Sequence, residues 1–433
     1  MEGNTVRTKR SLVTGGVALA AAAALILSGC STTPNAGQGQ ETSSNVLQIF
    51  WKGSEKPGID AVVKAYQAAH PEMQVVVTTA DTSQYQATLR TQLSAGTAAD
   101  VIFMWPANGN PASLQQIVPG GFVEDLSDHP WVANYPDAIK NLTSLDGKTY
   151  LMAPAVTSFG PWYNDTALQA AGLTAPSQWS DILPFCAAAK AAGKVAYGLG
   201  AANLDVTQNV LYGLVPDLVY GADPNHDAEL ASGKTTFSDN KGWKTAVDEY
   251  QQMYQAGCFN DDPTGTTQDD QNKLVASGGA FGMFGIGFQL AALRGYAPDS
   301  TFTLYPISGD DDPDTNLMAV SNAGGAAVNV KAANKKGAND FVDFLAQPEN
   351  LQIYNDALAG TVPSIPTGTV SDDPNLVTIT DYLSNGQTVH FLNQFWPNAR
   401  IEQAMYAGVQ GMLTDTTTPK EILASMDQEY AQK

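Results

Sequence analysis

The chain has 433 residues, of which 15% are charged, and it carries a formal net charge of −21. This acidic balance excludes the basic stripes that bind nucleic acid and disfavours adsorption to anionic lipid headgroups, but it does not select a ligand. A chain of this length is too long for a single core, so we expect two domains of about 150–200 residues each.

Residues 1–30 have the pattern of a secretory signal: basic residues, an apolar run over residues 12–27, then small residues before Cys30. The cysteine after the small pair resembles the lipobox of bacterial lipoproteins, which implies a diacylglycerol on the Cys30 sulfur. The alternatives are an ordinary cleaved signal or a short membrane helix, although the run is shorter than the ~20 residues of a membrane span. We therefore predict a signal peptide over residues 1–29 and a lipid-anchored protein on the extracellular face of the cell membrane.

The remaining chain begins with a Ser-, Thr-, Gly- and Gln-rich segment, residues 30–45, which predicts a flexible tether. Strand-like and helix-like segments then alternate, which is typical of an α/β domain with a largely parallel sheet. The strands are predicted at residues 46–51, 73–79, 100–105, 195–199, 280–284 and 326–330. The helices are predicted at residues 58–70, 85–95, 181–192, 243–256, 337–345, 397–413 and 419–430.

Cys186 and Cys258 are the two cysteines that remain after Cys30. In an oxidising compartment an even pair favours a disulfide. Cys186 lies in the predicted helix 181–192 and Cys258 follows the predicted helix 243–256, so a bond between helix ends is reasonable. Two buried thiols are the alternative.

Segments spread along the chain resemble the sugar-binding proteins of bacterial ABC importers, the family that includes maltose-binding protein. These segments are Leu47–Trp51 with the helix after it, Ala99–Phe103, Asp146–Tyr150, Trp162–Asn164, Ala175–Trp179 and Ser277–Met283. Gln178 departs from the usual Thr of its motif, and Gly279 departs from a usual Lys. Each motif alone is weak, whereas their order behind a lipobox is specific.

The resemblance implies an α/β, two-lobe periplasmic-binding-protein-like fold, with a ligand cleft between the lobes and multiple hinge crossings. The N-terminal lobe is expected at residues 46–156 and 307–346, and the C-terminal lobe at residues 157–306 and 347–433. Ligand is expected near the carboxyl ends of the strands, with the lobes closing around it by hinge motion.

A sugar offers ring hydroxyls and apolar C–H faces, so its site needs planar polar side chains and aromatic rings. The loop after the first strand supplies Trp51, Lys52, Glu55 and Lys56, with a solvated charged loop as the alternative. The loop after strand 100–105 supplies two further candidates, Trp105 and Asn108, with core packing as the alternative for the indole.

The predicted second lobe supplies further candidates. They are Thr157 at the crossing after Pro154, Asn203, Asp205 and Gln208 after the strand 195–199, and Phe288 after a Gly-Ile-Gly segment. Asp205 and Gln208 are equally good candidates for capping the next helix.

The tail adds Trp396 and Arg400, whose spacing of four brings both onto one helix face. The resemblance implies that both line the cleft, with a structural salt bridge as the alternative for Arg400.

We therefore expect a non-catalytic, monomeric receptor that captures a sugar, with an oligosaccharide favoured by the several indoles, and delivers it to a membrane permease. No cofactor or metal site is predicted, because the four histidines are scattered and the acidic turn 310–314 lacks the ligand spacing of an EF-hand.

A secreted glycoside hydrolase is the first alternative. Such an enzyme needs two carboxyls ~5–9 Å apart, and Glu55 with Asp205 is the candidate pair. The second alternative is the same fold with a different small solute.

Overall fold

The computed structural model describes residues 45–312, 316–368 and 373–432. The predicted signal peptide, nearly all of the predicted tether and the lipidation of Cys30 lie outside these residues. The predicted α/β fold class is confirmed, because the described chain alternates strands and helices and forms two main sheets.

The first sheet has four strands and forms the core of the N-terminal lobe. In spatial order they are β11 (Gly325–Val328), β3 (Val101–Met104), β1 (Val46–Lys52) and β2 (Gln74–Ala80). β1 pairs in parallel with β2 and β3, and β11 closes the sheet in antiparallel register with β3. All four residues of β3 are apolar and buried, as expected for a strand covered on both faces.

Helices pack on this sheet through apolar stripes. α1 (Lys56–Ala69) buries Ile59, Val62 and Tyr66, which recur at helical spacing. α2 (Thr82–Ala95) ends at Gly96, whose φ of 71° is left-handed and stops the helix, as predicted. The other elements of this part are α3 (Leu114–Ile117), α4 (Asp137–Thr143), β4 (Ser144–Leu145), β5 (Lys148–Thr149), α12 (Lys335–Leu345) and α13 (Pro348–Asp356).

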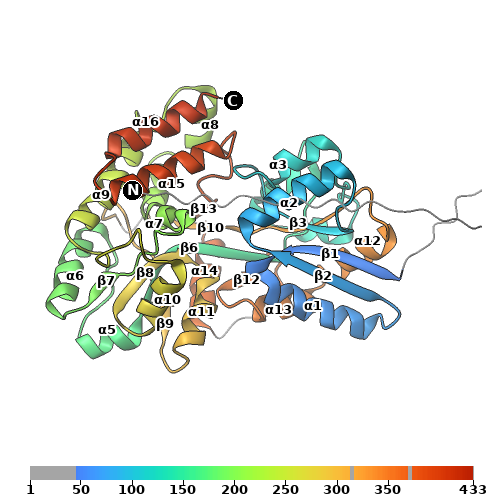
Figure 1. Ribbon diagram of the computed structural model, residues 1–433, viewed down its shortest axis with the longest axis horizontal. Coiled ribbons are helices and arrows are strands. Elements are labelled where there is room, and N and C mark those ends of the chain that lie inside the picture. Colours follow the sequence, from blue (N-terminus) through green and yellow to red (C-terminus); the bar gives the residue numbers. More distant parts are fainter. Residues whose placement is uncertain (1–44, 313–315, 369–372, 433) are drawn as a thin grey trace, which may run out of the picture. The chain divides into compact units, whose positions relative to one another are not determined.

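The second sheet is built around β6 (Ala155–Asn164), whose ten residues are all buried. Its order is β13 (Thr388–Val389), β10 (Met318–Asn322), β6, β8 (Ala280–Ile286) and β7 (Val195–Tyr197), and β9 (Phe302–Leu304) and β12 (Thr361–Pro363) also pair with β6. Figure 1 shows β6 running from β8 toward the first sheet.

Ten helices of the described chain accompany the second sheet. They are α5 (Asp165–Ala171), α6 (Trp179–Ala191), α7 (Asn209–Val215), α8 (His226–Ser232), α9 (Lys241–Gln255), α10 (Gln268–Ala276), α11 (Gln289–Tyr296), α14 (Pro374–Ser384), α15 (Arg400–Met412) and α16 (Pro419–Tyr430). A large buried cluster that includes Trp243, Trp396 and Met405 forms the core beneath α9, α15 and α16.

Two lobe boundaries differ from the prediction. The segment that contains β10 was expected in the N-terminal lobe, but β10 pairs with β6 and β13 in the second sheet. α13 was expected in the C-terminal lobe, but it packs against α1, and the Tyr354 hydroxyl donates to Glu55 Oε2 (2.7 Å). Both differences arise from long-range pairing that no local pattern encodes.

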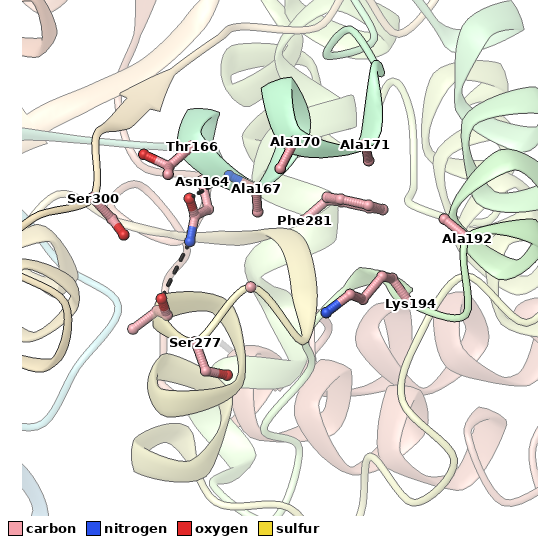
Figure 2. Close-up of a pocket in the computed structure, with 12 residues that line it drawn as sticks. Asn164, Thr166, Ala167, Ala170, Ala171, Ala192, Lys194, Ser277, Phe281 and Ser300 are labelled. Atoms are coloured by element: carbon pink, nitrogen blue, oxygen red, sulfur yellow. Dashed lines mark hydrogen bonds between the residues drawn. The ribbon is translucent and has the colours of Figure 1, made fainter.

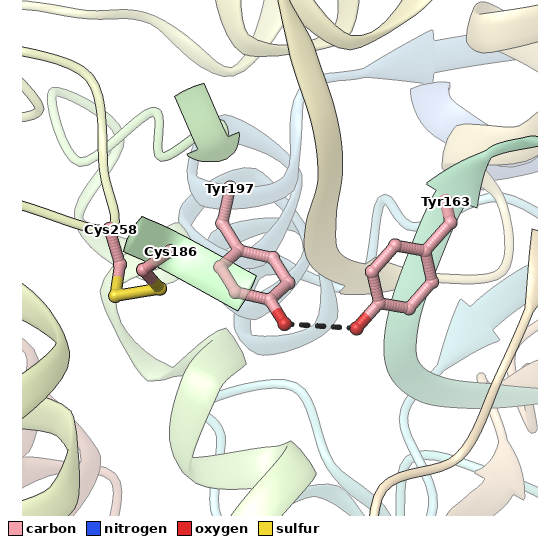
Figure 3. The surroundings of a disulfide bond; sticks show 4 residues. All are labelled: Tyr163, Cys186, Tyr197 and Cys258. Carbon is pink, nitrogen blue, oxygen red and sulfur yellow. Dashed lines mark hydrogen bonds between the residues drawn. A yellow bond between two sulfur atoms is a disulfide. The ribbon is translucent and has the colours of Figure 1, made fainter. Parts of the chain in front are cut away.

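A disulfide joins Cys186, on α6, to Cys258, just after α9, with their Cα atoms 4.9 Å apart. Both cysteines are buried in the second lobe. Figure 3 shows the bond beside Tyr197 of β7, whose hydroxyl lies 3.0 Å from that of Tyr163 on β6. No helix within the described residues combines the length and the apolar character that a membrane crossing requires.

Candidate functional site

A cavity of about 400 Å³ is lined by residues of both lobes and of the hinge between them. This volume falls in the range of small-molecule sites. The N-terminal lobe contributes residues that follow β1 and β3, and the C-terminal lobe contributes residues after β7 and β8 and on α15. Ligand is thus expected at the carboxyl ends of strands, where open α/β sheets bind it.

The N-terminal wall of the cavity centres on Lys52, at the end of β1. Its Nζ lies 5.8 Å from the ring centre of Phe103, 5.6 Å from that of Trp105 and 5.4 Å from that of Phe288. It also lies 3.4 Å from Glu55 Oε1. An ammonium within about 6 Å of a ring is attracted by its π face. Because Phe288 follows β8, Lys52 is attracted to a ring of the opposite lobe.

Trp105 is fixed by its neighbours and by the loop that follows it. Its ring packs edge-on against Phe103, with centroids 4.9 Å apart, and its backbone N–H donates to Ala112 O (3.2 Å). Asn108 is nearly buried, accepts from Gln116 Nε2 (2.9 Å) and donates its backbone N–H to Gln394 O (2.8 Å). The loop therefore presents the indole on a rigid support.

The C-terminal wall carries two carboxyl groups. Asp205 lies on a short 3-10 helix, Leu204–Gln208, and Glu402 lies on α15, which packs against that helix. Asn393 Nδ2 donates to Glu402 Oε1, and the Tyr212 hydroxyl donates to Asn393 Oδ1 (3.2 Å). Glu402, Asn393 and Tyr212 are thus hydrogen-bonded in a row, and Asp205 lines the same wall.

Burial dominates the electrostatics of this wall. It raises the pKa of Glu402 to about 7, against the lowering effect of hydrogen bonds with Tyr406 and Asn393. Burial also raises the pKa of Asp205, while a backbone hydrogen bond and the charge of Lys52 act in the opposite direction. The Asp205 side chain is open to the water of the cavity, but surrounding protein still reduces its hydration.

Gln208 lines the same wall and has an unused acceptor. Its Oε1 atom is buried and finds no hydrogen-bond partner among the residues that the structure describes. A buried polar atom without a partner costs about 1–3 kcal/mol, so a ligand hydroxyl that donates here would recover part of that cost.

The structure brings six of the predicted ligand residues together around the cavity. They are Lys52, Trp105, Asn108, Asp205, Gln208 and Phe288. Four of them either end a strand or follow one. Asp205 and Gln208 lie instead on the 3-10 helix that is reached from β7.

Three predicted residues of the first loop lie elsewhere. Trp51 is fully buried on β1, and its Nε1 donates to the Tyr354 hydroxyl (3.3 Å). Glu55 is also buried, where it accepts from the same hydroxyl. Lys56 opens α1 and forms an exposed ion pair with Asp60. Trp51 and Glu55 therefore join the first strand and its loop to α13 through Tyr354, and the Lys56 pair lies within α1.

Thr157 and Asn203 are also engaged in structural contacts. Thr157 is fully buried and donates to Gly360 O (3.2 Å). Asn203 Oδ1 accepts from the backbone N–H of Gln268 (2.9 Å). Neither residue lines the cavity.

The tail prediction is wrong for both of its residues. Trp396 is 1% exposed and packs against the rings of Phe237 and Trp243, with centroids 5.4 and 6.2 Å away. Arg400 Nε pairs with Glu429 Oε2 (3.0 Å), the structural salt bridge that was the alternative. The spacing argument failed because α15 begins only at Arg400.

Sequence reasoning missed residues of the second wall. They are Phe159, Tyr212, Phe391, Asn393, Glu402 and Tyr406. Glu402 and Tyr406 are four apart on α15, and Glu402 lies two positions after its first residue, so the same spacing applied inside the real helix includes this pair.

A second hollow, of about 420 Å³, lies beside α5 and is lined mostly by small residues, with Lys194 at one side. Asn164 is the amide drawn there in Figure 2, and its Nδ2 already donates to Val275 O and Ala276 O. Its Oδ1 accepts from Ala167 N. This hollow has one aromatic lining residue, Phe281, and lacks the paired walls of the cavity. Among the described residues, no three His, Cys, Asp or Glu side chains are placed to hold a metal.

Solved structures with the same fold include sugar-binding proteins. The solute-binding protein RafE in complex with raffinose matches with a TM-score of 0.76 and 18% identity, over 89% of this chain and 99% of that one. A sugar transporter protein of Bacillus licheniformis, in complex with stachyose, matches with a TM-score of 0.73 and 17% identity, over the same shares.

At the sequence level, an uncharacterised ABC transporter extracellular-binding protein of Pyrococcus horikoshii is 25% identical over 179 residues, 40% of this chain and 41% of that protein. The family model of bacterial extracellular solute-binding proteins matches residues 61–378. This match covers well over half of the chain, and the protein therefore belongs to the family of bacterial extracellular solute-binding proteins.

Proposed function

We propose that the protein is the extracellular receptor of an ABC importer, which captures an oligosaccharide in the cavity and passes it unchanged to a membrane permease. The observation that carries the proposal is the pairing of the two walls. Lys52 and Trp105 face Phe288 on one side, and a hydrogen-bonded acidic wall around Glu402 lies on the other. The raffinose and stachyose bound by the structural relatives support a sugar of this size class.

The chemistry of the walls suits a sugar. The rings of Trp105 and Phe288 offer flat apolar faces for C–H surfaces, and the carboxylates of Asp205 and Glu402 accept hydrogen bonds from hydroxyls. The free oxygen of Gln208 adds a third acceptor. A ligand that contacts both walls binds the closed arrangement of the lobes more tightly than the open one, and so shifts the population to the closed state.

A hydrolase is disfavoured by the position of the carboxyl groups. Glu55 does not line the cavity, so the candidate pair with Asp205 is lost. Asp205 and Glu402 both belong to the C-terminal wall, whereas a glycosidase places its two carboxyls on either side of the scissile bond. We therefore infer binding without chemistry.

The cellular context is part of the same proposal. A lipid on Cys30 and a loose tether would hold the receptor near the permease and raise its effective concentration there. The acidic chain is proposed to act as a monomer that binds neither nucleic acid nor a cofactor.

Calorimetric titration with raffinose, stachyose, xylan fragments and chitin oligosaccharides tests the proposal. At least one sugar is expected to bind with a Kd in the micromolar range or below, about −8 kcal/mol or stronger. Chromatography of the recovered sugar is expected to return it intact. Shortened products would instead support the hydrolase, and an absence of binding across neutral oligosaccharides would support a different solute.

A further inference from the structure

The loop that carries Asp205 and Gln208 into the cavity depends on a second segment of the chain. This loop, residues 198–208, follows β7 and ends in the 3-10 helix of the C-terminal wall. We call residues 258–268 the support segment, because they run alongside the loop from the end of α9 to the start of α10. Gln268, at its end, also lines the cavity.

Hydrogen bonds tie the loop to the support segment at successive positions. Leu199 N donates to Asn260 Oδ1 (2.8 Å), and Ala202 N donates to Thr266 O (3.0 Å). In the other direction, Gln268 N donates to Asn203 Oδ1 (2.9 Å). The loop has no regular secondary structure before residue 204, so these bonds help to define its path. Gly198 N also donates to Gly282 O on β8 (2.8 Å), and Gly200 N donates to Gln271 Oε1 on α10 (2.7 Å).

The two segments also approach each other too closely for independent movement. A Cβ atom on Gly200 would lie 2.7 Å from Thr267 O and 2.8 Å from the Gln268 backbone. Asn260 Nδ2 donates to Thr266 Oγ1 (2.9 Å), which holds the support segment in its own curved path. A shift of the support segment therefore shifts the loop.

The support segment starts at the disulfide. The backbone N–H of Tyr197, the last residue of β7, donates to the carbonyl oxygen of Cys258 (2.9 Å). The disulfide therefore lies where both the loop and the support segment begin. The partner, Cys186, lies on α6, which packs against β7. Figure 3 shows the sulfur atoms next to Tyr197.

We infer that the Cys186–Cys258 disulfide is a positioning element for ligand binding: it fixes the support segment, and through it the loop that presents Asp205 and Gln208. The inference rests on the proposed function for its ligand. It differs from a stabilising role alone, because it predicts a loss of affinity in protein that remains folded, together with local loosening of the loop.

The test compares the double variant Cys186→Ala/Cys258→Ala with the wild-type protein. Hydrogen exchange at the amides of Leu199 and Ala202, whose acceptors lie in the support segment, is expected to become at least about tenfold faster. Affinity for raffinose, or for stachyose if raffinose does not bind, is expected to fall about fivefold. Asn260→Ala, which keeps the disulfide and removes the bonds of this side chain to Leu199 and Thr266, is expected to change both readouts in the same direction.

Leu230→Ala on α8 is the matched control, because it opens a cavity in the same lobe core without touching the loop or its support. Its affinity and its exchange at residues 199–202 are expected to match the wild type. Unchanged affinity and unchanged exchange in the folded double variant and in Asn260→Ala would overturn the inference, as would equal losses in Leu230→Ala. Both cysteines being alkylated in untreated protein would also overturn it.

The exchange readout needs no ligand, so the two proposals fail separately. Wild-type protein that binds no sugar contradicts the proposed function, while the exchange rates still decide whether the disulfide positions the loop. Sugar affinity and loop exchange that both stay at wild-type values in the double variant contradict only the inference.

Discussion

The two walls of the cavity differ in charge and in how they are supported. The N-terminal wall has one cation, Lys52, lying among aromatic rings at the ends of β1 and β3. The C-terminal wall has two carboxyls, Asp205 and Glu402, and Glu402 is hydrogen-bonded to Asn393, which in turn accepts from Tyr212. Burial raises the pKa of both acids, so this wall resists being charged in the empty protein.

This difference predicts different responses to change. Substitutions on the N-terminal wall should alter ligand affinity with little effect on stability, because Lys52 and Trp105 lie at or just beyond the ends of their strands. Changes behind or within the C-terminal wall should alter stability and its pH dependence, because that wall belongs to the lobe core.

The largest expected effect is the loss of stability in Trp396→Ala, behind the C-terminal wall. Truncating a buried indole should lower the free energy of unfolding by about 3–5 kcal/mol, because it leaves a cavity beside Phe237 and Trp243. Urea denaturation measures the loss. Sugar affinity of the folded fraction should stay within about twofold of wild type. A tenfold loss of sugar affinity would show instead that Trp396 contributes to ligand binding.

Trp105→Ala should produce the reverse pattern on the N-terminal wall. Affinity for the bound oligosaccharide should fall about 30-fold, or ~2 kcal/mol, because the stacking surface is lost. Trp105→Phe keeps a ring and should recover part of the affinity. Calorimetry on all three proteins is the measurement, and equal affinities would show that the sugar does not stack there.

Glu402 should make stability depend on pH. Its folded pKa of about 7 lies above the ordinary value of 4.5, so the folded state holds the proton more tightly. The stabilising contribution of this carboxyl to the free energy of unfolding is therefore fully present below pH ~4.5. It is lost as pH rises to about 7, by at most ~1.4 kcal/mol per pH unit.

Asp217 and Glu249, whose pKa values burial raises to about 8, should act in the same direction. In Glu402→Gln the free energy of unfolding should therefore depend less steeply on pH than in the wild type. The part of the pH dependence that comes from Asp217 and Glu249 should remain. Urea midpoints between pH 4 and 8 measure it. A slope that Glu402→Gln leaves unchanged would place the ionisation of this carboxyl outside that range.

Lys52→Met should have a smaller effect. The variant keeps an apolar stem among the rings and removes the charge that they attract, so affinity should fall about fivefold, ~1 kcal/mol. The same titration measures it. An affinity equal to that of wild type would mean that the aromatic rings alone define this wall.

Arg400→Ala should have the smallest effect of all. Its ion pair with Glu429 is largely exposed, and such pairs contribute about 0–1 kcal/mol. Both the unfolding free energy and the sugar affinity should change little. A loss of affinity as large as that of Lys52→Met would contradict the placement of Arg400 outside the cavity.

The sequence predicted well those features that leave a local pattern. The buried run at residues 101–104 identified β3, and Lys52, Trp105 and Phe288 were found because each ends or directly follows a strand. The carboxyl edge of a sheet is where open α/β folds bind ligand, so position along the chain favoured these residues, but it also favoured Trp51, Glu55 and Lys56, which do not line the cavity.

Features that depend on distant partners could not be predicted. Glu55 reads as an exposed loop acid, and only Tyr354, 299 residues away, shows why it is buried. Trp396 is buried by Phe237 and Trp243, which no nearby residue indicates. The start of α15 was misplaced by three residues, and Trp396, which the family resemblance favoured, lies before the helix begins.

A crystal structure of the protein with the oligosaccharide that calorimetry identifies would test the central claim most directly. The account predicts one sugar ring against the indole of Trp105, and hydroxyls within hydrogen-bond distance of Asp205 or Glu402, so that both walls touch the same molecule. A sugar bound in the hollow beside α5, or held by one wall alone, would contradict it.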